Sequence, residues 1–189
     1  MDEKDRKIVR QLQRDGRTSY EKLGKIVGFT SVGAKKRVEK LISKGTIKIS
    51  ALLNIQAVKL NAALIMLETE SADAMRKILE RFKDCPRIVQ MFTSLGGYNL
   101  IALVIAEDQD TLQGISMEKC SLRTAEGVRR SEFCPIGEIE YSPYLPVREN
   151  LASRSRAVAP CTVDCRSCER YISLKCVRCP ATHYYRGPL

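Results

Sequence analysis

The chain has 189 residues, of which 44% are hydrophobic and 29% charged, with a net charge of +10, eight Cys and one His. This balance is that of a foldable chain and excludes wholesale disorder and membrane residence. The single His excludes His-based relays and multi-His metal sites, so that any metal site must rest on Cys. We see no apolar run typical of a signal peptide near the start, and expect a cytoplasmic protein.

The charge is distributed unevenly along the chain. Residues 1–50 carry a net charge of +8, residues 51–150 carry −3 and residues 151–189 carry +5. Such asymmetry indicates that the N-terminal segment meets a polyanion, and nucleic acid would supply affinity through counterion release. The alternative is a Lys-rich helical surface that is merely solvated.

The first 50 residues predict three helices. Asp2 caps the first, which ends near Asp15-Gly16, and Thr18 or Ser19 caps the second, which Gly28 ends. The third helix is expected from about residue 31 to 43, followed by Gly45 and a short extended exit. The expected apolar faces consist of Ile8, Val9 and Leu12, then Leu23, Ile26 and Val27, and then Val32, Ala34, Val38, Leu41 and Ile42.

The third helix has a basic side that carries Lys35, Lys36, Arg37 and Lys40. A short second helix, a tight turn and a basic third helix match a helix-turn-helix, in which the recognition helix enters the major groove of DNA. The alternative is a three-helix bundle whose basic face does nothing but meet solvent.

Spaced residues over this segment carry a resemblance to a known family. They are Asp2, Asp5, Ile8, Val9 and Leu12, then Asp15-Gly16-Arg17, and then Gly28-Phe29-Thr30, Ala34, Arg37-Val38, Leu41, Gly45 and Ile47. This pattern resembles the winged-type N-terminal domain of the Lrp/AsnC transcription regulators. The resemblance implies that a dimer reads double-stranded DNA at a pseudo-palindromic operator. The implied DNA-facing residues are Ser31, Lys35, Lys36, Arg37 and Lys40, although Arg37 lies close enough to the apolar face to brace the fold instead.

The middle segment predicts a β-α-β-β-α-β order. We expect strands over residues 58–67, 88–92, 99–105 and 128–139, the last broken at Cys134-Pro135, and helices over about 71–82 and 108–121. The Gly96-Gly97 pair is expected to make a tight turn. This order is the ferredoxin-like α+β arrangement, a sheet with both helices on one face. Pairing with a second copy would cover the open face.

The same order resembles the C-terminal effector-binding and assembly domain of the Lrp/AsnC family. That resemblance implies a homodimer, with tetramers and octamers as larger assemblies, and a small-molecule effector near Gly96, Gly97, Tyr98 and Asn99. Family members commonly have Asp where this chain has Asn99, and losing the carboxylate argues against an amino-acid effector. The alternative is a hairpin turn without a ligand. Cys85, Cys120 and Cys134 lack metal-ligand spacing and are expected to be buried small hydrophobes.

The C-terminal tail concentrates the remaining cysteines. After a linker over residues 147–160, the pattern Cys161-x3-Cys165-x2-Cys168-x7-Cys176-x2-Cys179 places five thiols within 19 residues. A segment of this size cannot bury a sufficient core alone, so metal ligation is expected to stabilise it. Disulfides are the alternative, disfavoured by the odd count and the expected compartment.

The metal is either zinc or iron. Four of the five cysteines would make a tetrahedral zinc site, whereas Pro180 after the last Cys also suits a [4Fe-4S] cluster. The run resembles small Cys-rich segments of anaerobic microbes, and we favour iron-sulfur, which would give the tail a sensing role. Zinc would imply a structural role. Basic and Tyr side chains of the tail could contact nucleic acid or simply meet solvent.

The expected domains are therefore a helix-turn-helix (1–50), a ferredoxin-like effector and oligomerisation domain (51–146), a linker (147–160) and a Cys-rich metal-binding tail (161–189). The function expected from them is sequence-specific transcription regulation with a redox- or metal-responsive tail. One alternative is an enzyme resembling siroheme decarboxylases, which share the fold but rely on histidines, and the only His here, His183, lies in the tail. Another is a non-specific DNA-architecture protein.

Overall fold

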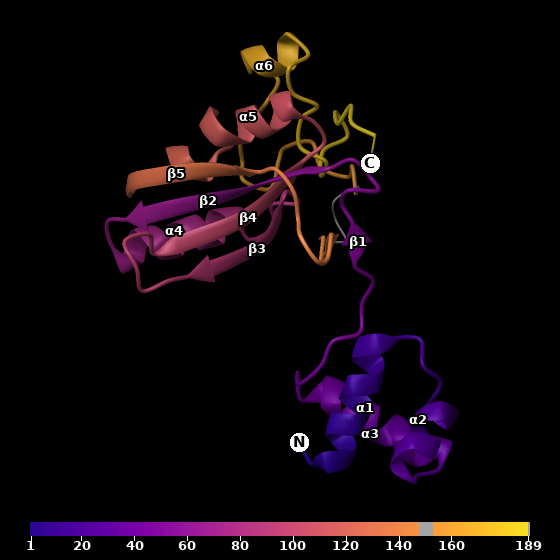
Figure 1. The fold of residues 1–189 in the computed structure, drawn as a ribbon. Helices are drawn as coiled ribbons and strands as arrows, with labels where there is room; N and C mark the ends of the chain where they lie inside the picture. Colours follow the sequence, from indigo (N-terminus) through magenta and orange to yellow (C-terminus); the bar gives the residue numbers. More distant parts are fainter. Residues whose placement is uncertain (148–152, 189) are drawn as a thin grey trace. The chain divides into compact units, whose positions relative to one another are not determined.

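The computed structural model describes residues 1–147 and 153–188 and divides into two compact units, Met1–Ala51 and Leu52–Leu189. Figure 1 shows helices alone in the first unit and a sheet with helices in the second. No helix in these described ranges is long and apolar enough to span a bilayer.

The N-terminal unit consists of three capped helices, α1 (Glu3–Arg14), α2 (Tyr20–Val27) and α3 (Ser31–Ser43). The side chains of Asp2, Ser19 and Thr30 each accept a hydrogen bond from a backbone N–H of the first turn that follows, which satisfies a donor that the helix leaves free. The predicted boundaries of these helices are thus confirmed. Their shared core contains Ile8, Leu23, Val27, Ala34, Val38 and Leu41.

Three apolar side chains expected in this core are exposed instead. Val32 is 61% exposed, Ile42 44% and Ile26 40%. The buried face of α3 runs through Ala34, Val38 and Leu41, which recur at the spacing of one helical stripe. Val32 precedes Ala34 by two positions and therefore projects about 200° away from it. The expectation for these residues was wrong because it followed apolarity rather than the helical period.

Gly24 holds the turn between α2 and α3 close to the helix. A Cβ on Gly24 would lie 2.5 Å from the backbone oxygen of Phe29. We expect Gly24→Ala to destabilise the unit by about 1–3 kcal/mol through overpacking, although alanine otherwise gains about 1 kcal/mol over glycine in a helix. The matched variant Gly33→Ala on α3, where the nearest foreign atom is 3.4 Å away, should be neutral or stabilising. Thermal unfolding of both variants measures the difference, and equal midpoints would contradict the expectation.

The second unit contains a four-stranded antiparallel sheet in the order β3-β4-β2-β5. Its strands are β2 (Asn61–Thr69), β3 (Ile88–Thr93), β4 (Leu100–Ala106) and β5 (Val128–Ile136). Helix α4 (Ala72–Phe82) follows β2, and α5 (Gln109–Met117) with a short 3-10 turn at Leu122–Thr124 follows β4. This chain order and strand order confirm the predicted ferredoxin-like α+β domain.

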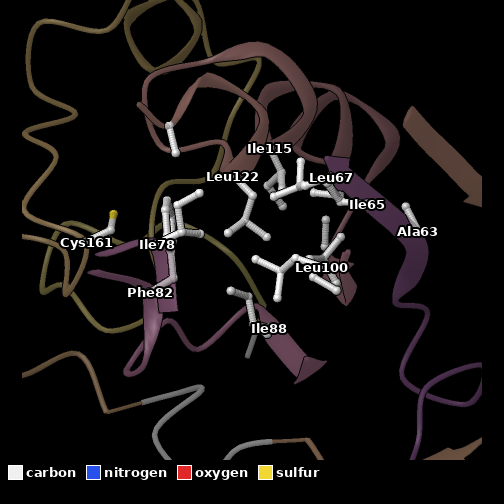
Figure 2. Close-up of a cluster of buried hydrophobic side chains, with 14 of the residues drawn as sticks. Ala63, Ile65, Leu67, Ile78, Phe82, Ile88, Leu100, Ile115, Leu122 and Cys161 are labelled. Carbon is white, nitrogen blue, oxygen red and sulfur yellow. The ribbon is translucent and has the colours of Figure 1, made fainter. Parts of the chain in front are cut away.

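The main core lies between the sheet and its two helices (Figure 2). Alternate residues of β2 and β4, among them Ile65 and Leu100, meet Phe82 of α4 and Ile115 of α5. The same core contains Ala159 and Cys161, each only 5% exposed. Residues 153–188, which include the short helix α6 (Glu169–Ile172), thus belong to the second unit rather than to a separate one. The tail buries its apolar atoms against a core that already exists.

The opposite face of the sheet is covered in part by a second, two-stranded sheet. Strand β1 (Leu53–Asn54) pairs with β6 (Tyr144–Leu145), and neither was predicted. Together with Ile55 and Leu60 they cover Ala62 and Ile105. Farther along the same face, Leu64, Met66, Ile101 and Leu103 are only half-buried and Phe92 is exposed. An apolar strip of the sheet therefore stays uncovered within the chain.

Two local predictions about the sheet were wrong. Strand β5 is not broken at Cys134-Pro135, since Cys134 pairs with Leu64 and Pro135 with Ala63. β5 is an edge strand, where the missing N–H of a proline costs no ladder bond. The turn between β3 and β4 is also longer than a two-residue one, because Thr93 pairs with Leu100 and neither Gly96 nor Gly97 has a positive φ.

Candidate functional site

Helix α3 presents a continuous polar side away from the core of the N-terminal unit. Ser31, Lys35, Lys36 and Lys40 are all exposed. Lys35 lies 3.8 Å from Glu39, but both side chains are about half exposed, so that this pair is weak. The predicted residues are therefore brought together on one helix face, where three ammonium groups are accessible to an anionic partner.

Arg37 is the predicted DNA-facing residue that lies apart from the others. Its Nη1 is 2.8 Å from Asp5 Oδ1 and also bonds Asp2, the capping residue of α1, while the guanidinium lies over the Phe29 ring. The bond from Arg37 lowers the pKa of Asp5, and the backbone N–H of Asp5 together with Arg37 lowers the pKa of Asp2. The guanidinium thus ties α3 to the start of α1, the bracing role that the sequence left open.

This ion-pair group predicts an acid-sensitive contribution to the stability of the N-terminal unit. Because the folded pKa values of Asp2 and Asp5 lie below the ordinary value of 3.8, their contribution is present above that pH and is lost as the pH falls through the folded values. Arg37→Met should therefore lower the midpoint of unfolding at pH 6, and the gap from the wild type should close below about pH 3. The midpoint is followed by the NMR signals of Ile8, and a gap that is independent of pH would contradict this assignment.

Val32 is a candidate that the sequence reasoning missed. It follows Ser31 in the first turn of α3 and is 61% exposed, on the side of the helix away from the core. The N-terminal residues of a recognition helix lie nearest to base edges, and an apolar side chain there can contact the methyl group of thymine. The helical period, applied strictly, would have identified it.

The predicted effector residues lie in the loop between β3 and β4. The carboxamide of Asn99 is fully occupied, because Oδ1 accepts from Thr69 N (2.9 Å) and Oγ1 (3.1 Å) while Nδ2 donates to Thr69 O (3.2 Å). Asp could not donate the last bond. The Tyr98 ring lies under the guanidinium of Arg130, 4.7 Å away, and Gly97 comes close to the same side chain. Asn99 therefore joins the ends of two strands, whatever the loop binds.

The five clustered cysteines of the tail surround an internal cavity of about 70 Å³, here named the thiol cavity. Cys85 and Cys120 of the sheet domain line it as well, so that seven of the eight cysteines face one space. Cys134 lies outside it on β5, with Sγ 3.7 Å from Glu132. His183 is exposed against the Tyr184 ring and does not line the cavity.

The backbone of the tail is shaped around these thiols. Thr162 directly follows Cys161, and Arg178 directly precedes Cys179; both have left-handed φ values, 66° and 72°. For a β-branched residue such as Thr this conformation is costly, and strained backbone of this kind clusters at functional sites. The N–H of Arg178 also donates to Cys176 Sγ at 3.4 Å, a bond that favours the thiolate form.

Two arginines of the tail bring buried positive charge to the thiol cavity. The Arg178 side chain is 1% exposed and lies between the Tyr171 and Tyr184 rings, with Nη2 3.5 Å from Asp164. Within the described part of the chain, Nε and Nη1 of Arg178 and Nε of Arg170 are buried without a hydrogen-bond partner. Buried N–H groups of a cation rarely stay unpaired, which indicates a missing anionic partner.

Burial keeps the cavity thiols protonated when nothing is bound. It raises the pKa of Cys165 to about 11 and that of Cys179 to about 12, and it raises the pKa of Cys120, to which the neighbouring Cys165, Cys161 and Cys176 add. A metal must displace these protons. Among residues 1–147 and 153–188, no three Cys, His, Asp or Glu side chains converge closely enough to hold one metal ion. The thiols surround a space rather than a point.

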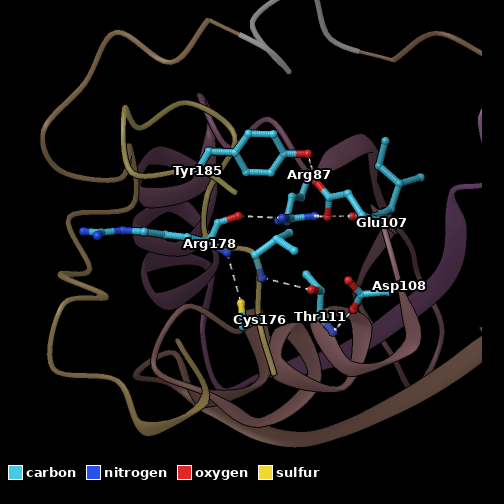
Figure 3. A network of polar contacts seen from close by, with 9 residues as sticks. Arg87, Glu107, Asp108, Thr111, Cys176, Arg178 and Tyr185 are labelled. Carbon is cyan, nitrogen blue, oxygen red and sulfur yellow. Dashed lines mark hydrogen bonds and ion pairs between the residues drawn. The ribbon is translucent and has the colours of Figure 1, made fainter. Parts of the chain in front are cut away.

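A buried polar network fastens the tail to the domain beside this cavity (Figure 3). Arg87 Nη1 lies 2.5 Å from Glu107, and its Nη2 donates to the carbonyl of Arg178 at 2.7 Å. Tyr185 donates to the other oxygen of Glu107 at 2.6 Å, and Val177 N donates to Thr111 at 3.3 Å. The tail therefore completes the hydrogen bonding of an ion pair that the sheet domain alone leaves short of partners.

Comparison with known proteins covers both units. Residues 1–42 match the AsnC-type helix-turn-helix domain and residues 62–136 the Lrp/AsnC ligand binding domain. An uncharacterized HTH-type transcriptional regulator of Pyrococcus abyssi is 30% identical over 149 residues, 78% of this chain and 92% of that protein.

Solved structures show the same fold. Escherichia coli AsnC (TM-score 0.64, 22% identity) covers 74% of this chain and 94% of its own. A Neisseria meningitidis regulator in complex with L-Met (TM-score 0.66, 22% identity) covers 78% and 97%. The two family matches end at residue 136, before the Cys-rich tail. The relatives are transcriptional regulators, which confirms the expectation of a DNA-binding protein rather than an enzyme, and this chain belongs to the Lrp/AsnC family of transcriptional regulators.

Proposed function

We propose that this regulator binds a pseudo-palindromic operator sequence-specifically, as a homodimer or a larger assembly of dimers, in the cytoplasm. The observation that carries the proposal is the exposed face of α3, where Ser31 and Val32 stand at the end that meets base edges and Lys35, Lys36 and Lys40 stand where phosphates run. Phosphate contacts position the helix, and the residues of its first turn read sequence.

The dimer is supported by the apolar strip left open on the sheet. Leu64, Met66, Ile101, Leu103 and Phe92 lie on the face that β1 and β6 do not cover. A second copy that buries this strip removes apolar surface from water, and two-fold symmetry then places two α3 helices for half-sites about one helical turn apart.

Footprinting on genomic fragments tests sequence-specific binding. We expect discrete protected regions with two-fold symmetry and half-sites spaced by about 10 base pairs. Uniform coverage without a preferred site would overturn the proposal in favour of a DNA-architecture protein.

The tail is proposed to hold a [4Fe-4S] cluster that makes regulation responsive to redox state or to cluster loss. Thiolates are the donors that such clusters take, and the thiol cavity offers seven of them around an open space, with unpaired guanidinium N–H groups beside it. A zinc ion would require four of these thiols to converge on one position, which the described geometry does not offer. Bound there, a cluster would fix the tail to the sheet domain and could be lost on oxidation.

Anaerobic purification followed by absorption spectroscopy and metal analysis tests the metal. We expect a brown preparation with about four irons per chain. A colourless preparation with one zinc per chain would replace the cluster by a structural zinc site.

No amino-acid effector is assigned to Gly96, Gly97, Tyr98 and Asn99, which stay a predicted effector site. The Neisseria relative is described with L-Met, but here the Asn99 carboxamide is used up by Thr69 and brings no carboxylate for an ammonium group. Calorimetric titration with L-Met tests this, and micromolar binding would show that other groups of the loop suffice.

A further inference from the structure

Cys85 and Cys120 are far in sequence from the clustered cysteines, yet they line the same cavity. Cys85 lies between α4 and β3, and Cys120 lies three residues after the end of α5. Both are packed against the core of the sheet domain. The wall of the thiol cavity therefore comes from two parts of the chain, and the domain contributes thiols of its own.

The segment that carries Cys120 is the one to which the tail is fastened. Arg81 of α4 donates from Nη2 to the Lys119 carbonyl (3.1 Å) and from Nε to the Cys161 carbonyl (3.5 Å). One guanidinium thus holds the backbone next to Cys120 and that of Cys161 together. Cys168 reaches the same segment, with Sγ 4.0 Å from Glu118 Oε2.

The neighbours of each thiol separate ligands from bystanders. Cys120 has three tail thiols as electrostatic neighbours, Cys161, Cys165 and Cys176, which make a group of four with it. Cys168 instead donates its S–H to the Glu118 carboxylate, and a thiol that keeps its proton for a carboxylate is not a metal ligand. Cys85 has only Cys161 and Cys179 as thiol neighbours.

On the basis of the proposed cluster, we infer that its ligands come from both parts of the chain, Cys120 of the sheet domain together with Cys161, Cys165 and Cys176 of the tail. The N–H of Arg178 on Cys176 and the unpaired Nε and Nη1 of Arg178 supply hydrogen bonds and positive charge for an anionic thiolate cluster. Four thiolates from two segments make the cluster a crosslink between domain and tail.

The experiment compares single Cys→Ser variants of the full chain, purified without oxygen. We expect Cys120→Ser to lose iron and acid-labile sulfide to near background, as Cys165→Ser does. Cys85→Ser, which changes the same cavity wall, and Cys134→Ser, which lies outside it, should keep the wild-type content. Circular dichroism and dimer size establish that each variant is folded.

A second measurement stands on the wild type alone, in case Cys120→Ser does not fold. Alkylation followed by mass spectrometry should modify Cys134 both before and after chelation of iron, but Cys120 only after it. Full iron content in folded Cys120→Ser, or alkylation of Cys120 in the iron-loaded protein, would overturn the inference and leave the cluster proposal intact. Wild type that binds no metal at all would remove the cluster proposal and this inference together.

Discussion

Replacing Lys35 and Lys36 with alanine is expected to weaken operator binding by at least about tenfold per lysine, since a hydrogen bond to a charged group contributes roughly 1.5–3 kcal/mol. Both ammonium groups are exposed on α3, and only Lys35 has a carboxylate partner there, a weak one. Removing one phosphate-binding ammonium group also lowers the slope of log affinity against log salt by about 0.9, so that the slope of the double variant should fall by about 1.8. Fluorescence anisotropy at several salt concentrations measures both quantities.

The matched control is Arg76→Ala with Lys77→Ala on α4. It removes the same charge from exposed positions of the second unit, where Arg76 already pairs with Asp73. The control should change affinity little and leave the salt slope unchanged. If the two double variants behaved alike, the affinity would reflect net charge, and α3 would not be the recognition helix.

Replacing Arg87 with alanine is expected to destabilise the second unit by about 3–5 kcal/mol, because it leaves the Glu107 carboxylate buried without its cation. Arg87 is 9% exposed and Glu107 only 2%, so water cannot replace the lost partner. The variant also removes the donor to the Arg178 carbonyl and should loosen the tail. Urea unfolding measures the stability, and limited proteolysis measures how readily the tail is cut.

Arg156→Ala is the control for this prediction. It breaks the other ion pair between tail and domain, with Asp84 at 3.6 Å, but both side chains are about half exposed. Such a pair contributes about 0–1 kcal/mol, so stability should change little. A similar loss in both variants would mean that burial of the Arg87 pair is not the source of its effect.

Local signals made the helical unit predictable from sequence. The caps Asp2, Ser19 and Thr30 fix where helices begin through bonds to residues three positions away, and Gly28 ends α2 with a φ of 71°. The sheet domain followed from the alternation of strand and helix patterns. Strands β1 and β6 could not be predicted, because two residues each carry no periodicity and their pairing joins residues about 90 positions apart in the chain.

The candidate sites were predictable to the extent that their residues are neighbours in sequence. The basic side of α3 and the five cysteines of the tail are each contained in one short segment. Cys85 and Cys120 gave no signal, since only packing brings them to the thiol cavity. Arg37 was ambiguous for the same reason: its partners Asp2 and Asp5 lie more than 30 positions earlier.

The burial of Ala159 and Cys161 in the core of the sheet domain sets an order for biosynthesis. Residues 1–51 form a unit of their own and can fold while the ribosome is still making the rest. The sheet domain has all its strands by Ile136 except β6, yet its core and its buried ion pair wait for residues up to Tyr185. At about 5–20 residues per second, that delay is roughly 3–10 seconds. A premature stop between residues 137 and 158 would therefore release a finished DNA-binding head on an unfinished domain with an open core, a product for proteases rather than a shorter regulator.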